Sequence, residues 1–175
     1  MLIILEDTRN KPGKHDLKGK YFEENGILVR RTKIYCGDYC LPVNQSVCID
    51  SKQNLQEVVG DLIQQHERFR AEADRAVEAG ITLYVLIEEP GMKTLEDVKH
   101  WENPRLHRYN KIKYMHSIGK WQNIPAPKGK PPIDNITLYK IMYTFAKKHG
   151  VIWEFCSPKD AGRRIVEILT GGSLS

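Results

Sequence analysis

Hydrophobic and polar positions divide the first third of the chain into segments with strand and helix patterns. The apolar run at 2–5 ends in Glu6 and Asp7, which predicts a buried strand with an acidic end. Apolar residues at helical spacing follow from 15 to 25, and Gly26 marks the end of this helix. The next segments are rich in β-forming residues, with predicted strands at 27–35, 38–43 and 46–52 and a turn at 44–45.

The rest of the chain alternates helical patterns with short apolar strands. Residues 54–79 have an apolar stripe at helical spacing, as one long helix or two in series. The run 81–87 is apolar at almost every position, which is typical of a strand buried on both faces, and Glu88 and Glu89 follow it at the sheet edge. A helix, a strand and a last helix are predicted at 136–149, 151–155 and 157–170. This order predicts an α/β fold with a mixed central β-sheet flanked by helices on both faces.

The segment before the helix at 136–149 differs from the rest of the chain in charge. Seven basic residues and no acidic residue lie between Asn103 and Ile133, whereas the whole chain has a net charge of only +5. Trp and Tyr residues are interleaved with these charges. Basic side chains neutralise phosphates and aromatic rings stack on exposed bases, so we expect this segment to contact nucleic acid. A solvated surface loop is the alternative.

The overall composition is that of an ordinary globular protein, with 175 residues, of which 41% are hydrophobic and 28% charged. No run approaches the ~20 apolar residues of a membrane helix, and no basic segment precedes the apolar N-terminal run as in a secretory signal. We therefore expect a cytoplasmic protein with no membrane partner. The cysteines have no zinc-ribbon spacing and are expected to be reduced thiols: Cys36, Cys40, Cys48 and Cys156.

The turn at 44–45 brings polar residues of two strands together. It pairs positions whose numbers add to about 88–90, so Asp38 faces the region from Asp50 to Lys52. Side chains alternate along a strand, so Asp50 and Lys52 project from one face and Ser51 from the other. Opposite positions in neighbouring strands lie roughly 5 Å apart, which suits two carboxylates that share a hard cation.

Two carboxylates and an ammonium in one place suit the hydrolysis of a phosphodiester. This reaction needs a nucleophilic water and neutralisation of negative charge, and Mg²⁺ or Mn²⁺ held by oxygen ligands supplies both. Lys52 can orient the attacking water or stabilise the charged phosphorane. Asp7, at the end of the first strand, is a further acidic candidate. The candidate catalytic residues are therefore Asp38, Asp50, Lys52 and Asp7. A salt-bridged surface hairpin is the alternative.

The spacing of Gly-Asp and apolar-Asp-x-Lys is that of PD-(D/E)xK nucleases, and the whole chain resembles the nuclease domain of XPF-type structure-specific endonucleases. Asp7-Thr8-Arg9 matches the D-x-R motif of that family, and Gly37-Asp38 matches its G-D motif. Ile49-Asp50-Ser51-Lys52 resembles its apolar-E-R-K motif, and Glu67-Arg68-Phe69 resembles an arginine-aromatic element in the next helix.

This resemblance implies one nuclease domain over residues 1–175, with a restriction-endonuclease-like core and a basic insertion at about 92–133. It implies that the metal is bound by Asp7, Asp38, Asp50 and the backbone carbonyl of Ser51. The basic residues expected to bind the substrate are Arg9, Arg68, Arg105, Arg108, Lys111 and Lys113. The resemblance also implies a homodimer that forms through the C-terminal helices.

Some positions depart from the family pattern. Asp50 and Ser51 stand where the family has Glu and Arg, and Gln56 and Asn10 stand where it has acidic residues. The expected function is a metal-dependent DNA endonuclease of bacterial or phage origin, with branched or single-strand-containing DNA as its substrate. Two alternatives stay open: a catalytically inactive DNA-binding or scaffolding paralogue, and an RNA-directed or nucleotide-handling enzyme with the same fold.

Overall fold

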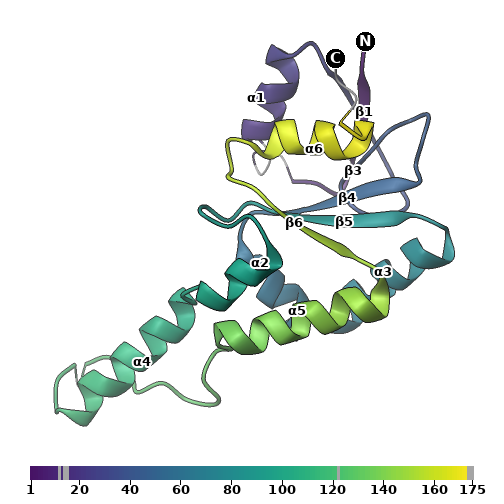
Figure 1. The fold of residues 1–175 in the computed structure, drawn as a ribbon. Helices are drawn as coiled ribbons and strands as arrows, with labels where there is room; N and C mark the ends of the chain where they lie inside the picture. Colours follow the sequence, from purple (N-terminus) through teal and green to yellow (C-terminus); the bar gives the residue numbers. More distant parts are fainter. Residues whose placement is uncertain (12, 14–15, 122, 173–175) are drawn as a thin grey trace.

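A central β-sheet organises the protein (Figure 1), whose computed structural model describes residues 1–11, 13, 16–121 and 123–172. Within these residues the sheet has six strands in the order β2-β1-β3-β4-β5-β6. The strands are β1 (Ile3–Asp7), β2 (Leu28–Thr32), β3 (Tyr39–Cys40), β4 (Val47–Lys52), β5 (Thr82–Ile87) and β6 (Ile152–Phe155).

The sheet is mixed, as predicted. Strand β1 runs parallel to β2 and antiparallel to β3, and β3 runs antiparallel to β4. Strands β5 and β6 continue parallel to β4. Tyr39 pairs with Ile49 and Cys40 with Cys48, so the predicted hairpin register is confirmed. The next positions beyond Tyr39 and Ile49 are Asp38 and Asp50, which brings these two residues to the same end of the ladder.

Helices cover both faces of this sheet, which confirms the predicted fold class (Figure 1). Helices α1 and α6 lie on one face, and α2, α3 and α5 lie on the other. The helices are α1 (Asp16–Glu24), α2 (Leu55–Val59), the π-helical turn η1 (Gly60–Gln64), α3 (His66–Glu78), the 3₁₀-helix η2 (Leu95–His100), α4 (Pro104–Ser117), α5 (Asn135–His149) and α6 (Ala161–Thr170). None of these helices is both long enough and apolar enough to cross a membrane.

Two hydrophobic clusters form the core, one on each side of the sheet. The cluster beneath α1 and α6 includes Phe22, Tyr39 and Ile165, which are all at most 2% exposed. The cluster between the sheet and α3 and α5 includes Phe69 and Phe145, whose rings stack with centroids 4.9 Å apart. The four cysteines are buried as free thiols. Burial of apolar surface on both faces holds the central strands, and with them the ends of β1, β3 and β4, in fixed positions.

Several boundaries differ from the predicted ones. Strand β2 ends at Thr32, and β3 has two residues and ends before Pro42, which has no backbone N–H to donate to a ladder. The helical region 54–79 is two α-helices in series, separated by a π turn in which the backbone N–H of Gln65 donates to the carbonyl of Gly60 at 3.0 Å. The predicted start of the first helix, at His15, lies outside the described residues.

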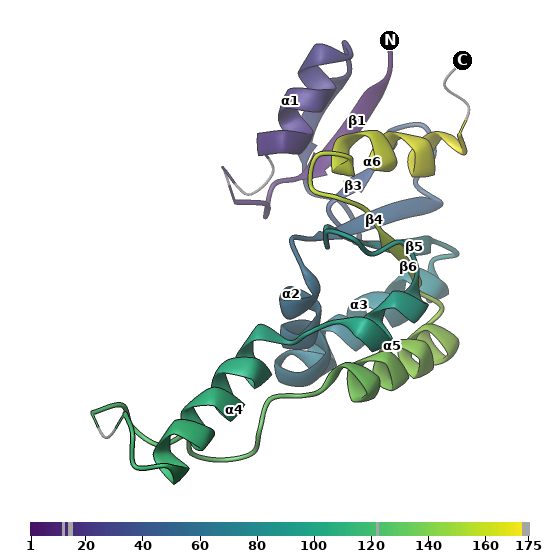
Figure 2. The ribbon, with the colours of Figure 1, turned by 60° about the vertical axis from the view of Figure 1, so that its left-hand side comes forward.

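The basic segment contains a helix that the sequence patterns did not predict. Helix α4 projects away from the sheet and the other helices, and the chain returns alongside it (Figures 1 and 2). Asn103 caps its start by accepting a hydrogen bond from the backbone N–H of Arg105, with Pro104 as the first helical residue. No residue of α4 is fully buried. We call α4 and the returning segment, residues 104–132, the arm.

Candidate active site

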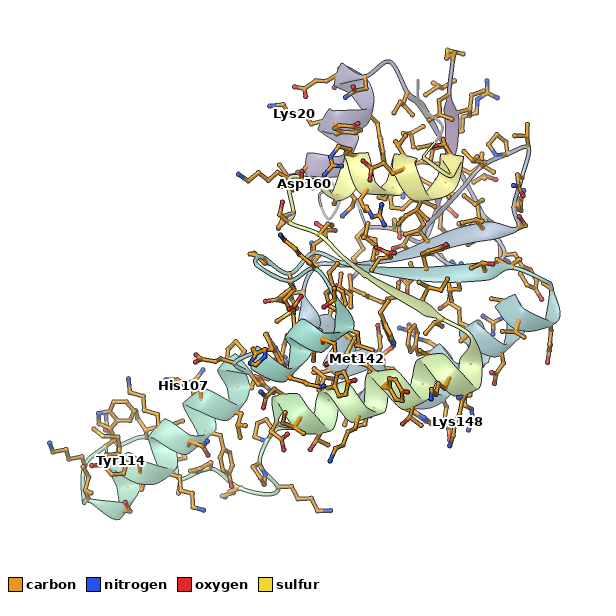
Figure 3. The ribbon with its side chains drawn as sticks, in the orientation of Figure 1. Lys20, His107, Tyr114, Met142, Lys148 and Asp160 are labelled. Atoms are coloured by element: carbon orange, nitrogen blue, oxygen red, sulfur yellow. The ribbon has the colours of Figure 1, made fainter. Side chains whose placement is uncertain are left out.

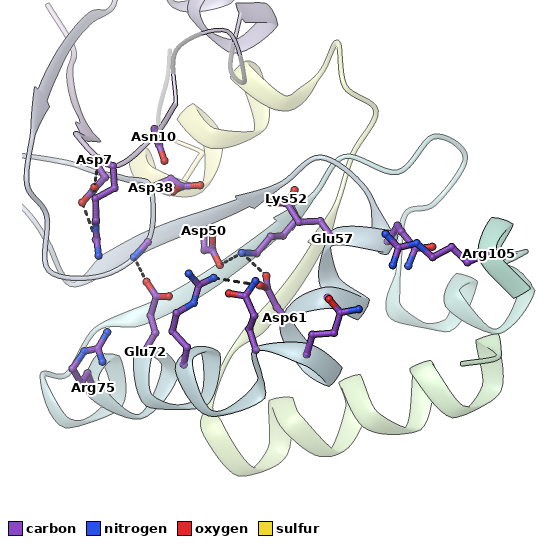
Figure 4. Close-up of a pocket in the computed structure, with 17 residues that line it drawn as sticks. Asp7, Asn10, Asp38, Asp50, Lys52, Glu57, Asp61, Glu72, Arg75 and Arg105 are labelled. Atoms are coloured by element: carbon purple, nitrogen blue, oxygen red, sulfur yellow. Dashed lines mark hydrogen bonds and ion pairs between the residues drawn. The ribbon is translucent and has the colours of Figure 1, made fainter. Parts of the chain in front are cut away.

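A polar cavity of about 490 Å³ lies where β1 and β4 end and β3 begins, against the helical layer of α2, η1 and α3 (Figure 4). Its lining is strongly charged. It comprises Asp7, Arg9, Asn10, Gly37, Asp38, Asp50, Lys52, Gln56, Glu57, Gly60, Asp61, Gln64, Gln65, Arg68, Glu72, Arg75 and Arg105. The four predicted catalytic residues all line this cavity: the hairpin brings Asp38, Asp50 and Lys52 together, as its geometry predicted, and Asp7 joins them from the end of β1.

The Gly37-Asp38 turn fixes the first carboxylate. Gly37 has φ +70°, and a Cβ atom built there would lie 2.7 Å from the carbonyl oxygen of Ile49, so only glycine fits. This close approach lets the backbone N–H of Asp38 donate to that carbonyl at 2.7 Å. The Asp38 carboxylate then accepts a hydrogen bond from the backbone N–H of Ser51 at 2.9 Å, which ties its side chain to β4. Glu72 of α3 accepts from the N–H of Gly37 at 2.9 Å and braces the turn from the other side.

Lys52 lies between two buried carboxylates (Figure 4). Its Nζ is 2.8 Å from Oδ2 of Asp50 and 2.7 Å from Oδ2 of Asp61, and the Asp50, Lys52 and Asp61 side chains are at most 10% exposed. The ring of Phe69 lies beneath the ammonium, 5.5 Å from Nζ to the centroid. Apart from the Lys52 ammonium, no described residue donates a hydrogen bond to either Oδ2 atom, so Lys52 is the polar partner of both.

These contacts keep Lys52 charged. Burial alone would lower the pKa of the Lys52 ammonium, but Asp50 and Asp61 outweigh it, and the pKa is raised above its usual range. A lysine with a raised pKa is a poor proton acceptor. In this arrangement Lys52 is therefore suited to orienting water or stabilising negative charge, and not to general-base catalysis.

Asp7 is held by an array of hydrogen bonds. Its Oδ1 accepts from the backbone N–H and the Nε of Arg9, both at 2.7 Å, and its Oδ2 accepts from Nη2 of Arg9 and from the N–H of Ile34. Burial alone would raise the pKa of the Asp7 carboxyl, but these donors together lower it. Asp7 thus lies in the cavity as an ionised group that already has several donors.

The oxygen atoms at this end of the sheet fit a hard divalent cation. Carbonyl directions alternate along a strand: the Ile49 carbonyl accepts a hydrogen bond from the N–H of Asp38, whereas the Lys52 carbonyl accepts one from the N–H of Glu88, the residue after β5. The alternation directs the Ser51 carbonyl to the side of β4 where Asp38 lies. Within the described residues, no three His, Cys, Asp or Glu side chains form a group that could hold a metal ion. The available set is two carboxylates and one carbonyl, which suits Mg²⁺ with several of its waters retained.

The opposite face of β4 has a separate buried polar cluster. The Ser51 hydroxyl donates to Oε1 of Glu88 at 3.1 Å, and the ammonium of Lys18 from α1 forms an ion pair with the same carboxylate. Glu89 accepts a hydrogen bond from the backbone N–H of Leu55 at the start of α2. The two acidic residues after β5 therefore do not line the cavity. Instead, they fix the end of β4 and the start of α2.

The predicted substrate-binding residues divide into two groups. Arg9, Arg68 and Arg105 line the cavity, and the Arg68 side chain is 73% exposed, with its Nη2 3.6 Å from Asp61. The other three lie outside the cavity on α4: Arg108, Lys111 and Lys113. Arg105 lies in the first turn of α4, so the cavity and the arm are contiguous.

Four charged cavity residues were not among the predicted site residues: Glu57, Asp61, Glu72 and Arg75. A signal was present in the helical segment. Polar residues repeat there at three- and four-residue intervals, at Glu57, Asp61, Gln64, Arg68, Glu72 and Arg75. This spacing places side chains on one helix face. The stripe runs beside the apolar one and faces the cavity.

Comparison with known proteins gives structural matches alone. No protein-family model matches the sequence, and no curated protein sequence matches it significantly. In three dimensions the chain is similar to XPF from Aeropyrum pernix, with 17% sequence identity and a TM-score of 0.61 over 99% of this chain and 62% of that one. It is also similar to XPF from Aeropyrum pernix in complex with DNA, with 18% identity and a TM-score of 0.59 over 100% of this chain and 68% of that one.

Such a likeness at low identity shows a shared fold. The chain spans less than two thirds of the first of these structures. The mixed α/β core that the motif resemblance implied is therefore confirmed in three dimensions.

Proposed function

We propose that this protein is a divalent-metal-dependent DNA endonuclease that uses Mg²⁺ or Mn²⁺. The convergence of Asp38, Asp50 and Lys52 on one charged cavity is the observation on which the proposal rests. The shared fold with XPF from Aeropyrum pernix supports it, and one of the similar structures is a complex with DNA.

In the proposed site, Asp38, Asp50 and the Ser51 carbonyl hold the cation, with Asp7 as a further acidic group. The bound cation would supply a more acidic water and neutralise charge on the phosphate. The protein's own groups perform the other tasks. Gly37 and the N–H of Ser51 fix the position of the Asp38 carboxylate, and Lys52 presents a permanent positive charge to the reacting phosphate.

The arm provides the surface for the rest of the DNA. Arg105 connects it to the cavity, and Arg108, Lys111 and Lys113 follow along α4. Tyr114 is 62% exposed near its far end (Figure 3). A basic surface with exposed aromatic rings suits phosphates and unstacked bases, so we propose substrates that contain branched or single-stranded DNA.

A substrate panel tests this proposal. The full chain is incubated with single-stranded, duplex, branched and flapped DNA and with RNA, each with Mg²⁺, Mn²⁺ or EDTA. We expect cleavage of at least one DNA that contains a single-stranded or branched region, and none in EDTA. Absence of cleavage with both metals would contradict the nuclease proposal, and preferential cleavage of RNA would replace DNA with RNA as the substrate.

A catalytically inactive DNA-binding paralogue is the second candidate. The observation that favours it is that Lys52 already forms ion pairs with both Asp50 and Asp61. Such a protein would bind the same DNA panel but would show no Mn²⁺ binding that depends on Asp50. Calorimetric titration of the wild-type chain and of Asp50→Asn with Mn²⁺ separates the two candidates.

We also propose a homodimer that forms through the C-terminal helices. Ile165, Val166 and Leu169 of α6 are buried in the protein's own core, so an interface on α6 would use its polar side, where Arg163 is 52% exposed. Sedimentation velocity at several protein concentrations tests this. A monomer at all concentrations would contradict the dimer without affecting the nuclease proposal.

A further inference from the structure

Asp61 has no role in the proposed metal set, yet it is a buried acid in the same cavity. It lies in the π turn between α2 and α3, and the residue is 5% exposed. Its Oδ2 contacts the Lys52 ammonium at 2.7 Å, and its Oδ1 is 3.6 Å from the exposed guanidinium of Arg68. A carboxylate buried to this degree is costly unless a cation compensates it, so its pairing with Lys52 is a structural requirement.

The Lys52 ammonium competes with a metal ion for Asp50. The ammonium contacts Oδ2 of Asp50 at 2.8 Å, and no other described residue donates a hydrogen bond to this oxygen. A divalent cation at Asp50 and Asp38 would withdraw the charge that now attracts Lys52, and would repel the ammonium across a short distance. Lys52 then needs another carboxylate partner, one that does not bind the metal.

The position of Asp61 suits it to be this second carboxylate partner of Lys52. It approaches Lys52 from the helical layer, whereas Asp50 lies in β4 and Asp38 in the turn just before β3 (Figure 4). The ammonium therefore bridges two carboxylates on different elements. Phe69 lies beneath it and limits the space into which it could retreat. The contact with Asp61 can persist when the contact with Asp50 is lost.

We propose that Asp61 is a positioning residue that holds the Lys52 ammonium when a divalent cation takes Asp50. This inference rests on the proposed function, because it assumes that Asp50 binds the metal. It assigns to Asp61 control of metal affinity through Lys52, without direct contact with the metal.

A double-mutant cycle in the absence of DNA tests this assignment. Mn²⁺ affinity is measured by calorimetry for the wild-type chain, Asp61→Asn, Lys52→Met and the double variant, with folding checked by circular dichroism. If Asp61 acts through Lys52, Asp61→Asn leaves Asp50 as the ammonium's only buried partner and weakens Mn²⁺ binding by about tenfold, which corresponds to roughly 1.4 kcal/mol. In the Lys52→Met background the same substitution changes the affinity by less than about threefold, because the competing ammonium is gone.

Two control variants accompany the cycle. Asp74→Asn removes an aspartate of α3 that pairs with His149 outside the cavity, and we expect unchanged Mn²⁺ affinity. Asp61→Glu retains the charge, and we expect it to restore much of the affinity lost in Asp61→Asn. Rescue by Glu would not follow if Asn acted only by loosening the local fold.

The outcomes separate this inference from the proposed function. If Asp61→Asn weakened Mn²⁺ binding equally in the wild-type and Lys52→Met backgrounds, Asp61 would be a direct ligand and the inference would be overturned. If Asp61→Asn weakened Mn²⁺ binding in neither background, the inference would also be overturned. If the wild-type chain itself binds no Mn²⁺, or Asp50→Asn binds it equally well, the proposed metal site is wrong and the inference fails with it.

Discussion

At the scale of single residues, the candidate site depends on a few close contacts between backbone and side chain. Gly37 allows the backbone to approach Ile49 closely, so that the N–H of Asp38 can donate a hydrogen bond to the Ile49 carbonyl. This contact places the Asp38 side chain beside Ser51. Among the described residues that line the cavity, Lys52 is the only one with an ammonium group, and Asp50 and Asp61 keep it charged. Each of these contacts can be removed individually.

Gly37→Ala should destabilise the protein. The new methyl group would meet the Ile49 carbonyl at 2.7 Å, and φ +70° is unfavourable for alanine. We expect the free energy of unfolding to fall by about 2 kcal/mol or more. Urea denaturation followed by circular dichroism measures this. Gly13→Ala is the matched control, because it also has a positive φ but no atom within 4 Å of the position that the added methyl group would take. Equal losses in the two variants would show that the close approach at Gly37 is unimportant.

Asp7 should give the protein an acid-sensitive component of stability. Its pKa is below the ordinary value of 3.8 in the folded protein, so its contribution is present above that value and is lost as the pH falls through the folded pKa. The difference in unfolding free energy between wild type and Asp7→Asn should be constant from about pH 7 to about pH 5 and should shrink below about pH 4.

Denaturation with urea across this pH range measures that difference. Arg9→Met removes the main donor to Asp7 and should give a difference with the same pH dependence. If the difference in unfolding free energy between wild type and either variant grew as the pH fell, the assignment of a lowered pKa to Asp7 would be contradicted.

At the scale of elements, the hairpin was predictable and the irregular segments were not. The register of β3 and β4 followed from the turn at 44–45 and the alternation of side chains. The sharp turn at Gly37 did not, because it depends on the contact between Gly37 and Ile49 across the sheet. Propensity describes neighbours in sequence, and this contact joins residues twelve positions apart in a specific geometry.

The helix α4 was missed for a different reason. Its capping signal, Asn103 followed by Pro104, was present in the sequence. Its apolar positions are few and its basic residues many, so the stripe was weak. The interpretation of this segment therefore rested on its basic charge and not on a helical pattern. In the structure Leu106, Tyr109 and Ile112 are only half-buried, which agrees with that weak stripe.

The cluster on the far face of β4 links α1 to the end of the strand. Lys18→Met should leave Glu88 buried without its ion-pair partner and should lower the free energy of unfolding by about 3–5 kcal/mol. The double variant Lys18→Met with Glu88→Gln should recover most of that loss. Urea denaturation measures both. A double variant that is as unstable as the single one would show that the cluster does not act as a pair.

At the scale of the whole molecule, the sheet core and the arm have separate tasks. The core holds the charged cavity at the ends of β1, β3 and β4. The arm projects away from the core (Figure 2) and has basic residues along α4. The fold followed from the sequence, and so did the placement of Asp38, Asp50 and Lys52 in one cavity. The roles proposed for Asp61 and the arm depend on where helices meet the sheet, which requires the three-dimensional structure.

The arm should account for a measurable part of DNA affinity. Lys111→Ala and Lys113→Ala should each weaken binding and should each lower the slope of log affinity against log salt by about 0.7–0.9 if the lysine contacts a phosphate. Fluorescence anisotropy with labelled single-stranded DNA at several salt concentrations measures this. Lys20→Ala on α1, at the opposite end of the protein, is the matched control (Figure 3). Slopes that do not change would place DNA elsewhere.

The most direct test of the account is the rate of metal-dependent DNA cleavage by Asp38→Asn, compared with wild type and with Asp74→Asn. Asp38 is fixed by Ser51 and takes part in the proposed metal set, whereas Asp74 pairs with His149 outside the cavity. We predict that Asp38→Asn lowers the rate by at least about 100-fold, the size of effect expected when a charge-stabilising group is removed, and that Asp74→Asn retains it. Cleavage by Asp38→Asn at the wild-type rate would contradict the assignment of this cavity as the active site.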